Sequence, residues 1–377
     1  MEIKKKYHIG LILIVALILS ACQTNWAIPV IGSEGTQNVI DKETVSFYIE
    51  KSQEEIDIVQ LGQMFYDIGY MLIDEVSFIT ENDRTVTYVW EDIAETTRIS
   101  STGEITLGDG ARLQPTKIEV IPSDLISEVK YSIMDISPTV IEALDLPVLP
   151  ESTGQVIYEA EAEHAVMILL DGTQYKKLSD MANAEDLSFL GEGIIIQKGL
   201  SVYPSISTSG SAAFLTSLPP LDNGVFGYGY RNTEATTLFD IAAQDGKSVI
   251  AIEGNSLPFN LRNAETTLSG DRDGNGFSDD NVYENAMDII GTQMPDLLYI
   301  HFHEIDDMGH KYGPESDQYE SAITRVDGYL AGIYNALPES TLMIIFADHG
   351  MHTTNEGGNH GTLTADDLII PMIFLEK

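Results

Sequence analysis

The sequence has a single cysteine, Cys22, and few basic residues, and both shortages limit what the protein can be. One cysteine excludes an intrachain disulfide, so the core and any bound metal must stabilise the fold. The 20 Lys and Arg residues stand against 59 Asp and Glu residues, which gives a formal charge of −39. Such an acidic chain repels nucleic acid and anionic membrane surfaces, and it attracts divalent cations. We therefore predict no nucleic-acid partner.

The N-terminus has the pattern of a bacterial lipoprotein signal peptide. Three lysines at 4–6 precede an apolar run from Ile9 to Leu19, which is short for a membrane span. The run ends in Leu19-Ser-Ala-Cys22, where small residues precede a cysteine that would become the acylated N-terminus. A plain secretory signal or an uncleaved anchor is the alternative. The prediction is an extracytoplasmic protein, lipid-anchored to the bacterial cell membrane through Cys22.

The rest of the chain changes in texture near residue 128. After a signal peptide at 1–22, residues 23–38 are expected to form a tether and residues 39–128 a small N-terminal α+β module. The apolar spacing of Ile56 to Leu72 predicts a helix in this module. Short strand-like runs follow at 76–79, 85–90, 98–107 and 117–121. The module shows no catalytic constellation.

Residues 129–377 alternate apolar runs with helical patterns, which predicts an α/β catalytic domain. Continuous apolar runs are typical of parallel strands buried on both faces, and they occur at 165–170, 248–252, 297–302 and 342–346. Helices are expected at 209–216, 236–243, 280–290 and 316–336. The fold class is therefore a mostly parallel sheet flanked by helices. Such sheets bind their ligands at the carboxyl ends of the strands.

Residues that bind metals gather after three of these runs. Six of the eight histidines lie between His301 and His360. Carboxylates and imidazoles are ligands for zinc and similar cations. One Asp-His pair is weak evidence, but three clusters at predicted strand ends indicate a metal centre. The clusters are Asp171, then Asp306 with His310, then Asp348-His349 with His360 shortly beyond.

The order of these motifs resembles that of the alkaline phosphatase superfamily, in its nucleotide pyrophosphatase/phosphodiesterase-like branch. The motifs are Asp171-Gly172, the segment from Pro204 to Thr216, Asp306-x-x-Gly-His310-x-x-Gly-Pro, Asp348-His-Gly-Met and His360-Gly361. The resemblance covers the chain from Ala165 onward. It implies an alkaline phosphatase-like core for the catalytic domain.

The resemblance also implies two divalent cations and a serine nucleophile. One cation would be held by Asp171, Asp348 and His349 and would touch Ser207, and the other by Asp306, His310 and His360. Ser207 would attack the phosphorus, with Thr208 as the alternative and Ser205 and Ser209 as further hydroxyls nearby. Zinc is the expected metal, with manganese or iron as alternatives. His352 competes with His360 as a ligand, because the interval from His349 to His360 is short for the family.

Two departures from the family pattern carry predictions. The branch often has an Asn three residues after the nucleophile, where this chain has Gly210. Relatives follow a strand like 368–375 with a Pro-Thr helix, whereas here such a helix, within 136–147, precedes Asp171. We therefore hypothesise a circular permutation, in which residues 138–145 pack beside strand 368–375. An unrelated Ser-Pro-Thr helix is the alternative.

A second, independent cation site is suggested by the acidic loop at 271–280. Oxygen-bearing residues stand at positions 1, 3, 5 and 9 of an EF-hand-like loop, namely Asp271, Asp273, Asn275 and Asp279. The bidentate Glu of position 12 is replaced by Val282. Calcium binding and a solvated acidic turn are equal alternatives here. Residues 228–231 and 254–260 are candidates for the rim of the substrate pocket.

The predicted activity is a metal-dependent phosphoric ester hydrolase of the phosphodiesterase/nucleotide pyrophosphatase type. The substrate would be a small phosphate ester, such as a nucleotide or a phospho-headgroup. One alternative is a phosphomonoesterase or phosphotransferase that uses the same site. Another is a non-catalytic, metal-binding surface lipoprotein.

Overall fold

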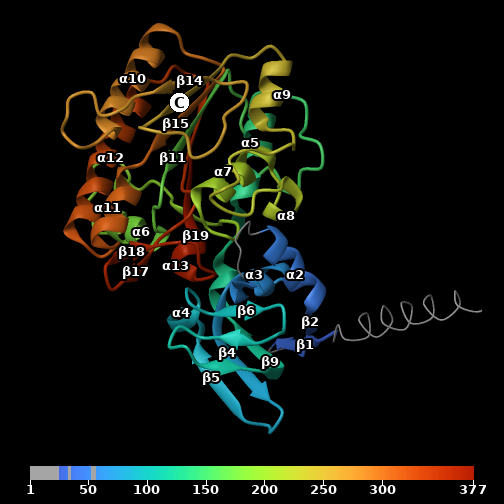
Figure 1. The fold of residues 1–377 in the computed structure, drawn as a ribbon. Coiled ribbons are helices and arrows are strands. Elements are labelled where there is room, and N and C mark those ends of the chain that lie inside the picture. The colour runs from blue at the N-terminus through green and yellow to red at the C-terminus, as the bar shows by residue number, and fades with distance from the viewer. Residues whose placement is uncertain (1–24, 33–34, 52–56) are drawn as a thin grey trace, which may run out of the picture.

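The computed structural model describes residues 25–32, 35–51 and 57–377, and it shows two parts that meet near the middle of the molecule (Figure 1). The smaller part holds the described residues of the N-terminal third of the chain, up to about residue 130. The larger part is built on an eight-stranded sheet. Within the described ranges, no helix has the length and apolar character needed to cross a membrane.

The N-terminal module combines two sheets with short helices. A five-stranded sheet has the order β2-β1-β9-β4-β5, and a four-stranded sheet the order β3-β6-β7-β8. The strands are β1 (Ala27–Gly32), β2 (Gln37–Asp41), β3 (Ile58–Gln60), β4 (Ile73–Thr80), β5 (Thr85–Val89), β6 (Arg98–Ser100), β7 (Ile105–Thr106), β8 (Arg112–Leu113) and β9 (Pro115–Pro122). The helices are α2 (Lys42–Lys51), α3 (Leu61–Asp67) and α4 (Trp90–Ile93), and the 3-10 turn η1 (Asp124–Glu128) follows.

Three expectations for this module were wrong. The segment expected to be a tether contains a strand, because Ala27–Gly32 forms β1, which pairs with β2 and β9. The helix expected from 56 to 72 shrinks to α3, because residues 58–60 pair with β6 instead. The strand expected at 98–107 is a hairpin that turns at Gly103, whose φ is +80°. In the first two cases pairing with a strand distant in the chain overrides the local pattern. The third is a local hairpin at the Ser101-Thr-Gly103 turn signal.

The larger part is a sheet with the order β10-β12-β19-β16-β11-β15-β13-β14. Pairings among β16, β11, β15, β13 and β14 are parallel, whereas β19 runs antiparallel to both of its neighbours. The strands are β10 (Tyr131–Ser132), β11 (His164–Leu170), β12 (Gln197–Leu200), β13 (Val249–Glu253), β14 (Glu265–Leu268), β15 (Leu297–Phe302), β16 (Thr341–Phe346) and β19 (Ile369–Glu376). A small hairpin is formed by β17 (His352–Thr354) and β18 (Gly357–Asn359).

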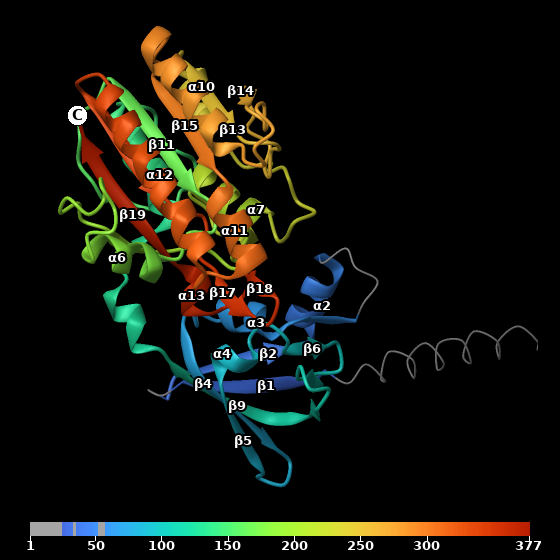
Figure 2. The same cartoon turned by 90° about the vertical axis from the view of Figure 1, so that its left-hand side faces the viewer.

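Helices cover both faces of this sheet (Figure 2). Successive side chains of β11 alternate between the faces: Met167 packs with one buried cluster and Ile168 with the other. The helices are α5 (Ile136–Ala143), α6 (Tyr175–Asn183), α7 (Ser207–Thr216), α8 (Pro220–Asn223), α9 (Leu238–Gln244), α10 (Asp279–Thr292), α11 (Glu304–Tyr312), α12 (Asp317–Ala336) and α13 (Ala365–Leu368), with the 3-10 turn η2 (Ile133–Asp135) before α5. The predicted fold class, a mostly parallel sheet flanked by helices beside a small α+β module, is confirmed.

Helix α5, which prompted the permutation hypothesis, packs in the larger part. Val140 and Ile141 share a buried cluster with Ile370 and Met372 of β19 and with Leu342 of β16. The Ser137 hydroxyl donates to the Phe214 carbonyl of α7. This is the position that the hypothesis requires, since a helix in the N-terminal module would have contradicted it. The permutation itself stays a hypothesis.

Candidate metal centre

The predicted ligands come from elements far apart in the chain and meet where the parallel strands end. Asp171 follows β11, Asp348 and His349 follow β16, and Asp306 and His310 lie on α11. His360 follows β18, and Ser207 is the first residue of α7. The sheet brings these residues together because parallel strands have their carboxyl ends at one edge. All seven predicted residues therefore line one region.

Four of them form site 1, which we define as Asp171, Ser207, Asp348 and His349. His349 Nε2 lies 3.4 Å from Asp171 Oδ1 and 3.6 Å from Asp348 Oδ2. The Ser207 Oγ lies 3.2 Å from His349 Nε2 and 3.4 Å from Asp171 Oδ1. His349 Nδ1 lies 2.9 Å from the Gly350 carbonyl and donates its proton there, which leaves Nε2 as the nitrogen that a cation could bind.

The other three form site 2, which we define as Asp306, His310 and His360. The Nε2 atoms of His310 and His360 are 3.1 Å apart, and His310 Nε2 is 3.4 Å from Asp306 Oδ2. Their Nδ1 atoms face backbone carbonyls of Gly358 and Ser205 at 3.2 Å and 3.1 Å. Both rings thus turn Nε2 inward. The His349 and His360 rings stack with centroids 3.7 Å apart, so the two sites adjoin.

The donor set fits two cations. Asp306 Oδ1 and Asp348 Oδ2 are buried, and neither has a hydrogen-bond partner among the residues described. An unpartnered buried carboxylate oxygen is costly, and a bound cation removes the cost. Ligand atoms of Asp171, Asp348 and His349 lie within 4.8 Å of one another, and so do those of Asp306, His349 and His360. These clusters could therefore hold metal ions.

Charge crowding shows in the pKa values of the metal-free chain. Burial, reinforced by Asp171, raises the pKa of Asp348 to about 6 and that of Asp306 well above its ordinary range. Burial opposes protonation of His349, but the carboxylates of Asp348 and Asp171 outweigh it and raise its pKa to about 9. For His360, burial and the neighbouring His349 and His310 lower the pKa to about 2. A cation would take over the charge balance that protons supply here.

Of the four candidate hydroxyls, only Ser207 faces the ligands. The Ser205 hydroxyl donates to the Thr362 carbonyl, and that of Ser209 to the Val225 carbonyl. Thr208 donates to the Gly227 carbonyl at 3.2 Å. The geometry therefore favours Ser207 over Thr208, and its role as a nucleophile stays a prediction.

His352, the alternative ligand, is turned away from the centre. Its Nδ1 lies 2.9 Å from Asp367 Oδ1, and its Nε2 faces Glu95 of the N-terminal module at 3.8 Å. His360 instead enters site 2. Short sequence spacing did not separate the two, because the β17-β18 hairpin reverses the chain between them.

Three of the four residues of the suggested calcium loop, Asp271, Asp273 and Asn275, are joined by hydrogen bonds from Asn275, whereas Asp279 is turned away from them. Asp271 accepts backbone N–H groups from Gly274, Asn275 and Gly276. Asp279 is buried and turned to α11, where it accepts the N–H groups of His303 and Glu304. The loop is thus a network of turns capped by its own carboxylates. The placement of Asp279 disagrees with a role in a calcium site.

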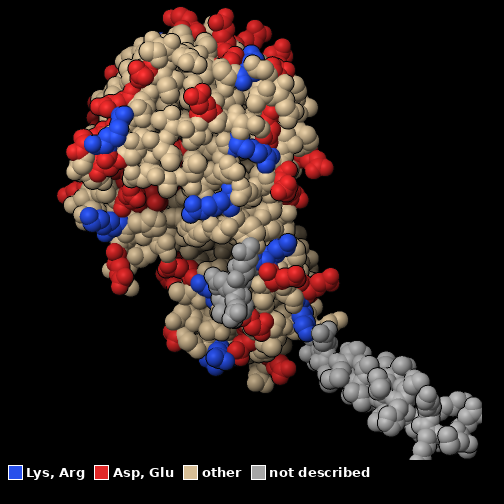
Figure 3. All heavy atoms as spheres, turned by 45° about the horizontal axis from the view of Figure 1, so that its top comes forward, with Lys and Arg blue, Asp and Glu red and all other residues tan. Residues whose placement is uncertain are grey.

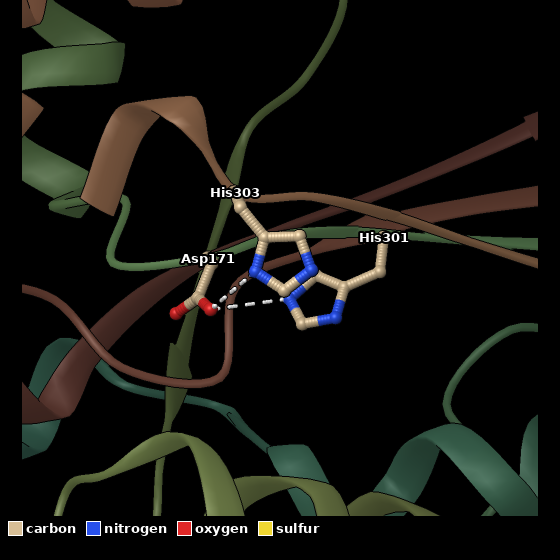
Figure 4. A group of neighbouring side chains, drawn as sticks. All are labelled: Asp171, His301 and His303. Carbon is tan, nitrogen blue, oxygen red and sulfur yellow. Dashed lines mark hydrogen bonds and ion pairs between the residues drawn. The ribbon is translucent and has the colours of Figure 1, made fainter. Parts of the chain in front are cut away.

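Sequence reasoning missed a third cluster beside site 1. His301, on β15, and His303 both face Asp171 Oδ2, at 3.2 Å and 3.5 Å (Figure 4). Burial and His303 lower the pKa of His301, but Glu253 and Asp171 outweigh them and raise it to about 9. Hydrogen bonds from both histidines hold the pKa of Asp171 well below its ordinary range, although burial opposes this. The available signal was the His-x-His spacing at the end of an apolar run.

A pocket of about 460 Å³ opens beside site 2, between the two parts of the molecule. One wall comes from the N-terminal module, and the other includes the Tyr228 segment that was expected at the rim. The Tyr228 ring meets the His360 ring edge-on at 6.3 Å. Its lining includes Tyr48, Lys51, Phe226, Tyr228, Tyr230 and His360. Figure 3 shows acidic residues scattered over this face of the molecule, with basic residues among them near the junction of the two parts.

Fold and site together describe an α/β domain whose carboxylate and histidine clusters could hold metal ions. Residues 254–371 match the family model described as type I phosphodiesterase/nucleotide pyrophosphatase. This match confirms the resemblance predicted from the motifs. It supports phosphoester transfer or hydrolysis as the chemistry of this fold.

Curated relatives match a segment of about a hundred residues. GPI ethanolamine phosphate transferase 2 of Yarrowia lipolytica is 37% identical over 98 residues, which is 25% of this chain and 11% of that protein. The catalytic subunit of human GPI ethanolamine phosphate transferase 3 is 30% identical over 103 residues, which is 27% of this chain and 8% of that protein. The chain thus spans about a tenth of the length of these relatives.

Similar solved structures include a phosphonoacetate hydrolase from Sinorhizobium meliloti, with 19% identity and a TM-score of 0.43 over 54% of this chain and 60% of that one. Murine ectonucleotide pyrophosphatase/phosphodiesterase 5 has 17% identity and a TM-score of 0.41 over 52% of this chain and 59% of that one.

The predicted bacterial lipoprotein is wrong on these comparisons. The curated relatives above are transferases of a yeast and of human, and a further one is from Saccharomyces cerevisiae. They give no support to a signal peptide or to a lipid anchor in a bacterial cell membrane. Cys22 and the segment before it lie outside the described residues. A short apolar run before Ala-Cys is a local pattern, and such a pattern arises without acylation.

Proposed function

We propose that this chain is a metal-dependent phosphodiesterase that uses Ser207 as its nucleophile. One observation carries the proposal: the Ser207 Oγ lies 3.2 Å from His349 Nε2 and 3.4 Å from Asp171 Oδ1, near two buried carboxylate oxygens that have no hydrogen-bond partner among the described residues. Zinc is the metal that these mixed imidazole and carboxylate ligands favour. When bound, the two cations would lower the pKa of the serine hydroxyl and stabilise charge on the phosphoryl oxygens.

The residues of the chain divide the remaining work. The Ser207 Oγ gives up its proton and forms a bond to phosphorus, while the bond from phosphorus to the leaving oxygen breaks and that oxygen takes up a proton. Helix α7 begins at Ser207, so its first turn presents backbone N–H groups to the phosphate oxygens. Backbone carbonyls hold His349, His310 and His360 with Nε2 inward, which keeps the ligands in place between turnovers. Water then cleaves the phosphoserine and restores the hydroxyl.

The pocket favours a diester over a monoester. A monoester needs room for one substituent on phosphorus, whereas a diester needs a second. The cavity of about 460 Å³ beside His360 provides that room, and its Phe226 and Tyr230 rings, 5.8 Å apart, suit a nucleoside or the apolar part of a phospho-headgroup. A small phosphate ester of one of these types is therefore the proposed substrate.

The names of the curated relatives favour a second candidate, a phosphotransferase. It would form the same phosphoserine and differ only in the second step, where an alcohol replaces water. Phosphorus NMR of the products, with and without an added alcohol such as ethanolamine, separates the two candidates. A hydrolase releases the free monoester, and a transferase yields a new diester.

The test of the nucleophile is Ser207→Ala. We expect turnover of bis-para-nitrophenyl phosphate to fall by at least about a thousandfold, because the covalent step is lost. The metal content should stay unchanged, because the carboxylates and imidazoles remain. Thr208→Ala is the matched control, and it should keep activity within a few-fold. Unchanged rates in Ser207→Ala, or equal losses in both variants, would refute this nucleophile.

A further inference from the structure

The third cluster has a geometry that the proposed two-metal reaction does not use. The rings of His301 and His303 lie side by side, with centroids 3.7 Å apart and an angle of 34° between them. Their inner nitrogens, His301 Nε2 and His303 Nδ1, face one oxygen, Asp171 Oδ2, at 3.2 Å and 3.5 Å (Figure 4). Their outer nitrogens face one oxygen of Glu253, Oε2, at 2.9 Å and 3.1 Å.

The outer contacts decide where the ring protons are. A carboxylate oxygen accepts, so the outer nitrogen of each ring donates its N–H to Glu253. Glu253 is 1% exposed, so water does not compete for these two hydrogen bonds. One buried carboxylate therefore orients both imidazoles in the same sense. This is how proteins orient histidines whose other nitrogen binds a metal.

The inner contacts are then explained by a cation. In two neutral rings, both inner lone pairs would point at the same anionic oxygen, which is repulsive. In two protonated rings, the protons on the inner nitrogens balance the charge of Asp171, and a bound cation takes the place of such protons. A single cation held by His301 Nε2, His303 Nδ1 and Asp171 Oδ2 makes every one of these contacts attractive. Ligand atoms of these three residues lie within 4.8 Å of one another.

We propose that Asp171, His301 and His303 bind a third divalent cation, with Glu253 as the carboxylate that orients both histidines. Two imidazoles and one carboxylate are a ligand set for zinc or another borderline transition metal, in preference to magnesium or calcium. Asp171 is shared between two sites: its Oδ1 faces Ser207 and His349, whereas its Oδ2 faces the histidine pair. The side chain of His303 is 19% exposed, which leaves a route for the ion to enter.

The third cation also gives Asp171 a fixed orientation. Asp171 Oδ1 faces Ser207 only while the Asp171 carboxylate keeps its orientation. A cation bound to Asp171 Oδ2 would fix that orientation. The inference shares Asp171 with the proposed function, but it concerns a separate ion. Its test can therefore give a different answer from the test of catalysis.

The experiment locates each ion separately. The full chain is loaded with zinc, its metal content is measured by mass spectrometry, and crystals are examined for anomalous scattering at the zinc edge. We expect three equivalents per chain, with one peak between Asp171 and the two histidines. His303→Ala should bind one equivalent fewer and lose that peak alone. His352→Gln, which alters a histidine held by Asp367 outside the three sites, is the matched control and should keep all three.

A milder variant guards against misfolding. Glu253→Gln keeps the size of the side chain but removes the charge that fixes both rings, and it should weaken binding of the third equivalent about 10- to 100-fold. Peaks at sites 1 and 2 with none at the histidine pair would overturn the third site and leave the proposed function standing. An anomalous peak at His301 and His303 alone would support the third site and contradict the two-metal reaction. A chain that binds no zinc would contradict both the third site and the proposed function.

Discussion

At the scale of single residues, Gly210 shows how closely the ligands are packed. A Cβ at this position would lie 2.8 Å from the Asp348 Cβ and 3.0 Å from the Asp348 carbonyl oxygen. Real Cβ atoms do not approach backbone so closely, so any side chain here must displace Asp348. The Asn that relatives often carry at this position therefore has no space in this chain. If a phosphate binds as proposed, the contact that this Asn makes in relatives has to come from another residue.

The corresponding prediction is for Gly210→Ala. The added methyl should push Asp348 out of site 1 and weaken metal binding at that site at least about tenfold, with a matching loss of activity. Titration with zinc, followed by calorimetry, measures the first effect. Gly328→Ala is the control: it lies in α12, its Cβ would meet nothing within 4 Å, and it should stabilise the fold by about 0.5–1 kcal/mol. Unchanged zinc affinity in Gly210→Ala would contradict this prediction, because it would mean that the added methyl does not displace Asp348 from site 1.

At the scale of elements, the start of α9 is held by a network around one carboxylate. Asp240 accepts the N–H of Thr237, while the Thr237 hydroxyl accepts the N–H of Asp240. The guanidinium of Arg262 donates to both oxygens of Asp240, which ties the helix to the loop after β13. Burial opposes ionisation of Asp240, but Arg262 and Thr237 outweigh it and lower its pKa to about 2. The ionised carboxylate therefore stabilises the fold.

The pH dependence follows from that direction. The Asp240 carboxylate has a lower pKa in the folded state, about 2, than in the unfolded chain, about 3.9. Its contribution to the free energy of unfolding is therefore complete above about pH 3.9 and is lost as the pH falls through 2. Asp240→Asn should cost about 1–2 kcal/mol at pH 7, because the partly exposed Arg262 is screened by solvent. Urea unfolding of both proteins should show this difference narrowing as the pH is lowered from 5 towards about 3.

Asp245→Asn, at the exposed C-cap of the same helix, is the matched control and should change stability little at either pH. A difference between the wild type and Asp240→Asn that stays constant from pH 5 to about 3 would mean that the carboxylate charge is not what stabilises α9.

At the scale of the whole molecule, the two parts share a core. Trp90 of the N-terminal module is fully buried, and its Nε1 donates to the Leu363 carbonyl at 2.8 Å. The same buried cluster includes Leu368, the last residue of α13, and Ile369, the first residue of β19, both in the larger part. His352 and Asn359 reach across to Glu95. The N-terminal module therefore supports the hairpin that carries His360.

This shared core predicts cooperative unfolding. Trp90→Ala should destabilise the protein by about 3–5 kcal/mol, and both parts should unfold in one transition at a lower temperature. Differential scanning calorimetry measures this, with the zinc content of the folded protein as a second readout. Trp26→Phe, a partly exposed residue within the module, should cost far less. Two separate transitions, with only the first shifted, would show that the parts are independent.

Much of this protein follows from its sequence alone. Unbroken apolar runs predicted the central parallel strands, because a strand buried on both faces needs no polar side chain. Polar residues directly after those runs predicted where Asp171, Asp306 and Asp348 meet, because parallel strands end at one edge. The order of motifs identified the phosphodiesterase-like segment, which the family match confirms.

Tertiary structure decided the rest, because the remaining choices depend on contacts between residues far apart in the chain. Sequence spacing left Ser207 beside three other hydroxyls and His360 beside His352, and only packing shows which of them turn inward. Strand pairing converted an expected tether into β1 and part of an expected helix into β3. The cluster of His301, His303 and Glu253 was hidden for the same reason, since β13 and β15 become neighbours only in the folded sheet.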